Sequence, residues 1–278
     1  MTNAQCLQLD LMSAAAVPVK PRFNVIVLAA QRPGTVDPLA VVHKASHKCL
    51  IPIAGKPLIA HVLETISRHP AVDDIRVSIE CQAFADIETV IDQLDVGIGQ
   101  IACAASKDNL ADSVIAAMME IQDGPVIITT ADNALLTIGA IDAMVTMLEG
   151  DADVALALAP KAAVLQAHPD GQRRFYKFSD DQYSNCNLYG LSGRDALAAA
   201  EIFRGGGQFA KKVGRIIESF GLLNLLLLRS GWVSLPGAMA RISKRIGLTI
   251  KPVILAEGRN AIDVDNERSY GIVAGLLD

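Results

Sequence analysis

The chain has 278 residues, enough for one large α/β domain or two smaller ones with a sizeable core. Hydrophobic residues make up 51% of it but aromatic ones only 4%, so the core must consist of Ala, Val, Ile and Leu, as in sheets buried on both faces. The net charge of −5 argues against a broad basic surface for nucleic acid, but it leaves room for a local cationic pocket that binds a small anion.

Strands and helices alternate along most of the chain. After a loosely ordered lead-in over 1–22, the pattern predicts strands at 23–30, 74–80, 99–106, 125–131, 153–160 and 248–257. It predicts helices at 57–69, 83–94, 109–122, 138–150 and 266–277. Such alternation favours a mostly parallel sheet with helices on both faces.

The alternation breaks in the second half of the chain. Residues 173–191 read as two strands around a polar turn, and 194–204 as a helix. Residues 205–247 are apolar and punctuated by glycine, which predicts a helical insertion within a single domain over 23–278. We expect its apolar face to pack on the domain or on a second subunit of a homodimer. The alternatives are a membrane-surface role linked to lipid head-group synthesis and an interaction module over 213–240.

Cysteine usage and the absence of a leader pattern favour a cytoplasmic protein. The five cysteines are scattered without a CxxC motif, which suits reduced thiols. No basic segment precedes the apolar residues near the start. The longest uncharged apolar run of the C-terminal half, 219–228, is far shorter than the roughly 20 residues that span a bilayer.

Ligands of open parallel sheets bind at the carboxyl ends of the strands, which directs attention to the loops at 31–56, 105–112, 131–137 and 184–187. The first of these is too long for a plain connection. Its cations and glycines suit a polyphosphate, although a solvated surface loop is the alternative. They are Arg32, Lys44, Lys48 and Lys56, with Gly34 and Gly55. Neither GxGxxG nor a P-loop motif is present.

The stretch "VIVLAAQRPG…HKCLIPIAGKPLIAHVLETI" resembles the opening of the MobA-like nucleotidyltransferases. That family begins with a strand, LAAGxGxR, a lysine and a Pro-x-x-Gly-[KR]-Pro turn into a helix. Here Gln31 replaces the first glycine of the signature, Lys48 takes the position of the family lysine, and 52–57 supplies the turn.

Further matches lie downstream. Residues 111–118 resemble the DSVxxGL helix start of the cytidylyltransferase branch. Residues 126–137 resemble the family's strand that ends in a metal-binding Asp. Residues 261–270 resemble the closing "DIDTPEDL" motif of the family. The resemblance covers 23–160 and 248–278, whereas 161–247 match loosely. It implies the three-layer α/β nucleotide-diphospho-sugar transferase fold, which is GT-A-like and Rossmann-like, with a mostly parallel mixed sheet.

The resemblance implies a reaction in which an NTP and a phosphorylated acceptor form an NDP-linked product and pyrophosphate. CTP is the first choice because of "DSV", and GTP the second. The acceptor would be a small sugar, polyol or hydroxy-acid phosphate. Because the acceptor phosphate is itself the nucleophile, the protein has to align two anions and neutralise charge, which calls for Mg²⁺, a lysine and backbone N–H groups.

The resemblance also implies roles for individual residues. Lys48 and Arg32 would act on the NTP phosphates, and Asp132 would share Mg²⁺ with Asp263 or Asp265. Without the ion, such carboxylates repel one another. The residues expected to contact the nucleotide are Leu28, Ala29, Ala30, Gln31, Gly34, Ser106, Asp112 and Ser113. Those expected to face the acceptor are Arg173, Arg174, Lys177, Asn185, Asn187 and Lys211.

Each of these residues also has a structural interpretation. The lysines and arginines suit a solvated surface, the aspartates suit turns and helix caps, and Asp112 or Ser113 could equally cap a helix. Gln31 cannot adopt the positive φ of glycine freely, and its side chain would crowd a phosphate. A catalytically degenerate protein that binds a nucleotide or phospho-ligand is therefore the alternative function, and pyrophosphate release distinguishes the two.

Overall fold

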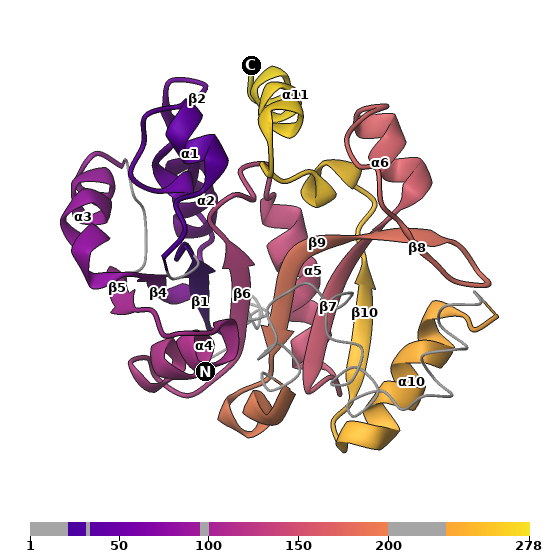
Figure 1. Ribbon diagram of the computed structural model, residues 1–278. Coiled ribbons are helices and arrows are strands. Elements are labelled where there is room, and N and C mark those ends of the chain that lie inside the picture. Colours follow the sequence, from indigo (N-terminus) through magenta and orange to yellow (C-terminus); the bar gives the residue numbers. More distant parts are fainter. Residues whose placement is uncertain (1–21, 32–33, 95–99, 200–231) are drawn as a thin grey trace, which may run out of the picture.

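A computed structural model describes residues 22–31, 34–94, 100–199 and 232–278 (Figure 1). The lead-in up to residue 21 lies outside these ranges, as do Arg32, Lys211 and the predicted insertion up to residue 231. Within the described part of 205–247, residues 235–246 form a helix. Among the described residues, no helix has the length and apolar character that a membrane crossing requires.

The centre of the molecule is an eight-stranded sheet in which β8 pairs only with β9 and the remaining strands follow the order β10-β7-β9-β6-β1-β4-β5. Its strands are β1 (Phe23–Leu28), β4 (Val72–Ile79), β5 (Gln100–Ala105), β6 (Val126–Thr130), β7 (Val154–Pro160), β8 (Tyr176–Lys177), β9 (Gln182–Leu191) and β10 (Ile250–Ile254). β9 runs antiparallel to all three of its partners, β6, β7 and β8, and all the other pairs of this sheet are parallel. The mostly parallel mixed sheet is therefore confirmed.

Helices cover both faces of the sheet and make three layers, because successive residues of each strand point to opposite sides. In β1, Val25 and Val27 join the core under one helical layer, and Ile26 joins the core under the other. The first layer contains α1 (Pro38–Val42), α2 (Leu58–Ser67), α3 (Phe84–Asp92), α5 (Ile138–Glu149), α6 (Lys161–Ala167) and α11 (Glu267–Leu277). The second contains α4 (Leu110–Met119) and α10 (Leu235–Ile246).

Local sequence signals fix several boundaries. Thr137 caps α5, because its side chain accepts a hydrogen bond from the N–H of Ala140. Ser234 caps α10, and Gly247 ends that helix with a φ of 77°. Within the predicted helix at 194–204, residues 194–199 form a 3₁₀-helix, and the rest lies beyond the described part.

The second strand of the predicted hairpin over 173–191 lies inside the sheet. This strand, β9, pairs with β6 on one side and β7 on the other, where Thr129 pairs with Leu188 and Leu158 with Asn185. Reversal of this one strand brings residues 185–188 to the carboxyl end of β6. The hairpin therefore places side chains at the edge of the sheet where the ligand-binding loops of a parallel sheet meet.

Candidate active site

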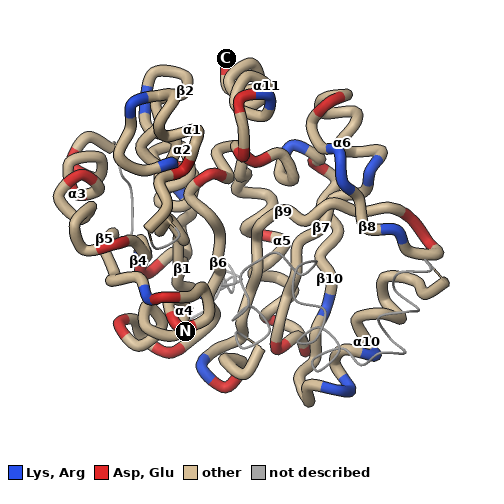
Figure 2. The backbone as a smooth tube through the Cα atoms, in the orientation of Figure 1, with Lys and Arg blue, Asp and Glu red and all other residues tan. Residues whose placement is uncertain are grey.

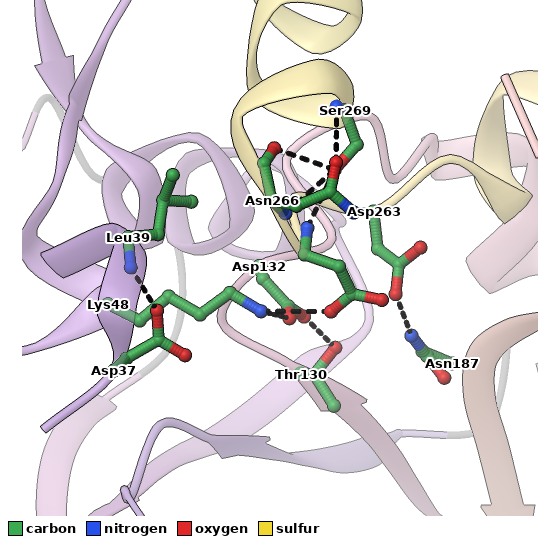
Figure 3. A network of polar contacts seen from close by, with 10 residues as sticks. Asp37, Leu39, Lys48, Thr130, Asp132, Asn187, Asp263, Asn266 and Ser269 are labelled. Atoms are coloured by element: carbon green, nitrogen blue, oxygen red, sulfur yellow. Dashed lines mark hydrogen bonds and ion pairs between the residues drawn. The ribbon is translucent and has the colours of Figure 1, made fainter. Parts of the chain in front are cut away.

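Lys48 and Asp132 come from separate loops and meet above the sheet. Lys48 begins the 3₁₀-helix η1 (Lys48–Leu50) near the end of the first loop, and Asp132 lies two residues beyond β6. Lys48 Nζ donates to Asp132 Oδ2 at 2.5 Å and to Asp265 Oδ1 at 3.1 Å (Figure 3). Thr130 Oγ1 donates to the other oxygen of Asp132 at 2.5 Å. Lys48, Asp132 and Asp265 are therefore in direct contact, and Thr130 holds the second oxygen of Asp132.

Asp263 and Asp265 follow β10, which is not a neighbour of β6, because β7 and β9 lie between these two strands. Instead, the chain turns through η4 (Gly258–Ala261) and crosses back over the strand ends (Figure 1). The N–H of Val264 donates to the carbonyl of Asp132 at 3.2 Å, and Asn266 then caps α11.

The three aspartates form one acidic cluster. One carboxylate oxygen of each of Asp132, Asp263 and Asp265 lies within 4.8 Å of the others. Burial and repulsion by Asp132 and Asp265 raise the pKa of Asp263 to about 7. Burial works against a charge on Lys48, yet the nearby Asp132 and Asp265 outweigh it and raise the pKa of its ammonium group. Three oxygen donors with an excess of negative charge fit a hard cation such as Mg²⁺.

Gln31 anchors the first loop. Its side-chain amide donates to the carbonyl of Ser46 at 2.9 Å and accepts from the N–H of Asp37 at 3.0 Å. Gln31 is not among the described residues with positive φ, whereas Gly34 has a φ of 72°. The expected conflict between Gln31 and a glycine conformation is therefore absent from the backbone, because Gln31 does not have a positive φ.

The predicted turn at 52–57 is a tight hairpin of β2 (Pro52–Ile53) and β3 (Lys56–Pro57). Ala54 and Gly55 both have positive φ, of 44° and 82°. Two helices hold the hairpin from different sides. His61 Nε2 of α2 lies 3.0 Å from the carbonyl of Ile53, and the Tyr270 hydroxyl of α11 donates to the carbonyl of Pro52 at 2.7 Å.

The three residues after β5 that are predicted to contact the nucleotide lie at or before the start of α4. Asn109, which sequence reasoning missed, caps this helix by accepting from the N–H of Asp112 at 3.0 Å. The buried Ser113 hydroxyl donates to the Asn109 carbonyl at 2.9 Å. Ser106 lies at the strand end, where its N–H donates to the carbonyl of Ile79. The cap is thus Asn109, and the alternative in which Asp112 or Ser113 caps this helix is wrong.

The side chains predicted to face an acceptor fall into two groups. Arg173, Arg174 and Lys177 are exposed on or before β8, and Figure 2 shows lysine and arginine gathered around α6 and β8. Asn185 and Asn187 are partly buried, and Asn187 contacts the acidic cluster. Asn187 Nδ2 donates to Asp263 Oδ2 at 2.8 Å.

Two polar residues of the site escaped sequence reasoning. Thr130 is the last residue of β6, and its hydroxyl donates to Asp132 in the turn that follows. Glu80 follows β4, the neighbour of β1, and its Oε1 accepts from the N–H of Gln31 at 2.7 Å. The rule that strand ends carry sites would have drawn attention to Glu80.

Solved structures with the same fold include several transferases. A hypothetical transferase from Thermus thermophilus is 20% identical, with a TM-score of 0.71 over 90% of this chain and 99% of that one. The 4-diphosphocytidyl-2C-methyl-D-erythritol synthase from Anaerococcus prevotii is 11% identical, with a TM-score of 0.60 over 93% and 99%. A CMP:2-keto-3-deoxy-manno-octonic acid synthetase in complex with CTP is 14% identical, with a TM-score of 0.56 over 92% and 98%. These likenesses show the nucleotide-diphospho-sugar transferase fold.

Sequence comparison assigns the family. No curated protein has a significant sequence match to the chain. The family model described as the MobA-like NTP transferase domain, however, matches residues 26–212, well over half of the chain. The chain therefore belongs to the MobA-like NTP transferase family.

Proposed function

We propose that the protein is a Mg²⁺-dependent nucleotidyltransferase that joins the NMP of an NTP to a small phosphorylated acceptor and releases pyrophosphate. The observation that carries the proposal is the convergence of Lys48 with Asp132, Asp263 and Asp265 at the carboxyl edge of the sheet. Family membership and the shared fold support it. The acceptor class is a sugar, polyol or hydroxy-acid phosphate.

In this reaction the protein has to align the NTP with the acceptor and neutralise the negative charge of their phosphates. Asp132, with Asp263 or Asp265, would hold Mg²⁺, which supplies charge neutralisation at the NTP phosphates. Lys48, already beside these carboxylates, would contact the same phosphates. The first loop, with Gln31, Gly34 and Arg32, would enclose the polyphosphate. The acceptor phosphate attacks the α-phosphorus directly, so no protein nucleophile is required.

The acceptor would approach from the side of β8 and β9. Arg173, Arg174 and Lys177 are exposed cations in this region, and an anionic acceptor needs such partners. Among the nucleotides, we favour CTP over GTP. The "DSV" at 112–114 supports this order, and one structure of this fold was solved with CTP and another is named for a cytidyl product.

Product formation tests the proposal. The protein is incubated with each NTP, Mg²⁺ and a panel of phosphorylated sugars, polyols and hydroxy acids, and pyrophosphate is followed. Thermal unfolding with NTP, with and without Mg²⁺, tests the metal site separately. The wild type should gain stability only when both are present. Asp132→Asn, Asp263→Asn and Asp265→Asn should lose most of that gain, and full gains in all three would contradict the proposed site.

One observation favours a second function. The N–H of Gln31 lies in the expected phosphate loop, but the Glu80 carboxylate accepts its hydrogen bond. A loop whose amide is occupied by a carboxylate suits a protein that binds a nucleotide or phospho-ligand without turnover. Such a protein would show ligand-dependent stabilisation and no pyrophosphate with any NTP and acceptor pair.

A further inference from the structure

We propose that Asn187 is a positioning residue that orients the Asp263 carboxylate for metal binding. The proposal rests on the proposed function, because it assigns a role toward the same metal site. Asn187 Nδ2 donates to Asp263 Oδ2 at 2.8 Å (Figure 3). Residues that orient a metal ligand typically matter for metal affinity although they do not touch the ion.

The backbone brings Asn187 to this position at a conformational cost. Asn187 has a φ of 48°, in the left-handed region that most side chains avoid and asparagine tolerates. The register between β9 and β7 also shifts at this point: Leu156 pairs with Tyr189, but Leu158 pairs with Asn185. Such a bulge re-aims a side chain, and here it directs an amide from the strand toward Asp263.

A second amide fixes which way Asn187 faces. Asn185 Nδ2 donates to Asn187 Oδ1 at 3.0 Å and to the Tyr189 hydroxyl at 2.6 Å. Asn185 Oδ1 accepts from the N–H of Asn187 at 3.2 Å. Because the Asn187 oxygen is engaged by Asn185, its amino group is the end that faces Asp263. The network therefore presents a donor, and not an acceptor, to the carboxylate.

Asp263 has a particular need for this donor. Among the described residues, Lys48 forms ion pairs with Asp132 and Asp265 but not with Asp263. Asn187 thus supplies Asp263 with a side-chain hydrogen bond inside a cluster of like charges.

The test measures Mn²⁺ affinity by electron paramagnetic resonance on the full chain, with Mn²⁺ as the probe for the Mg²⁺ site. Asn187→Gly keeps the left-handed backbone and removes the amide, and it should weaken Mn²⁺ binding by about 10–100-fold. Asn185→Ala leaves Asn187 in place without its orienting contact and should weaken binding in the same direction by a smaller factor. Wild-type Mn²⁺ affinity in both variants would overturn the proposal.

A double-mutant cycle separates positioning from direct contact. In an Asp263→Asn background, Asn187→Gly should cause no further loss, because Asn187 acts through Asp263. A full additional loss would overturn the proposal and assign Asn187 its own contact with the ion. Asn24→Gly is the matched control: this asparagine is buried in β1 and bonded to the carbonyl of Gln122, so its loss should lower stability and leave Mn²⁺ affinity unchanged.

The same measurements distinguish failure of the positioning role from failure of the proposed function. If the wild type binds Mn²⁺ and Asp132→Asn abolishes this, the metal site stands, and Asn187→Gly alone decides the positioning role. If neither Asp132→Asn nor Asp263→Asn alters Mn²⁺ affinity, the metal site and the positioning role are both overturned.

Discussion

The Lys48 ammonium group lies against two of the three carboxylates of the proposed metal site. Its side chain is 18% exposed, as against 16% for Asp132 and 62% for Asp265. The sequence predicts that the bare carboxylates repel one another, and the structure adds a cation that relieves part of this repulsion. Lys48 therefore has a structural role in the metal-free chain besides its proposed contact with NTP.

Lys48→Ala should affect both roles. Turnover should fall by at least about tenfold, roughly 1.4 kcal/mol of barrier, because a charge contact to the phosphates is lost. In EDTA, thermal unfolding should occur at a lower temperature than in the wild type, since the carboxylates lose their cation. Steady-state kinetics and calorimetry measure the two effects. Lys251→Ala, which removes an exposed ion pair with Asp151, is the control, and unchanged kinetics at saturating NTP would reject the catalytic role.

For Gln31, the sequence predicts a conflict but not the hydrogen bonds that the side chain makes. Its replacement of a signature glycine is visible in the sequence, and so is the conflict with a phosphate. Its hydrogen bonds to Asp37 and Ser46 are not, because they depend on how the loop folds back on itself. Lys48 and Asp132, by contrast, could be predicted because motif position and strand-end position agree.

At the scale of elements, η4 and α6 pack with almost no space between their backbones. A Cβ built on Gly258 would lie 2.1 Å from the carbonyl oxygen of Ala163. The chain continues from η4 directly into the stretch that carries Asp263 and Asp265. The position of η4 therefore sets the position of two proposed metal ligands.

Gly258→Ala should lower the free energy of unfolding by roughly 1–3 kcal/mol, because one backbone must move away from the other. It should also weaken Mn²⁺ binding, since η4 leads to Asp263. Denaturant unfolding and metal titration check both effects. Gly271→Ala in α11 is the matched control: nothing lies within 4 Å of its Cβ, and helix propensity should stabilise the protein by about 0.5–1 kcal/mol. Equal stability of the two variants would contradict the packing argument.

The contact between α2 and the β2–β3 hairpin should make stability depend on pH. Burial lowers the pKa of His61 from its ordinary value of 6.5, and its ring faces the carbonyl of Ile53. The unfolded chain then takes up a proton at a higher pH than the folded one. Stability should be fully present above about pH 6.5 and decrease as the pH falls toward the folded-state pKa.

His61→Gln keeps a side-chain donor but removes the titration, so its stability should fall less steeply on acidification. Denaturant unfolding at several pH values between about 5 and 8 compares the two proteins. Parallel profiles would show that His61 does not contribute to the dependence.

Strand and helix identities could largely be predicted, because burial on both faces and helical periodicity leave strong patterns. Two features of the sheet could not. The antiparallel insertion of β9 and the edge position of β10 depend on contacts between distant segments, which periodicity does not record. The short α1 and α6 also escaped prediction: they have five and seven residues, too few for a periodic pattern.

For the molecule as a whole, the predicted three-layer α/β fold is confirmed. This fold explains why the position of a loop after a strand indicates which residues lie close together. Parallel strands share one carboxyl edge, so residues that follow different strands approach one another once the sheet forms. Asp132 and Lys48 meet by this rule. Asp263 and Asp265 do not follow from it, because their segment reaches the site only by crossing back over neighbouring strands.

That crossing bears on the order in which the molecule assembles. Lys48 and Asp265 are 217 residues apart in the chain, and we expect a contact of such separation to form after the intervening sheet. Species that contain the sheet but lack the crossing segment have no complete acidic cluster. A cation or nucleotide that binds to the acidic cluster should therefore stabilise the native state relative to partly folded states that lack this cluster.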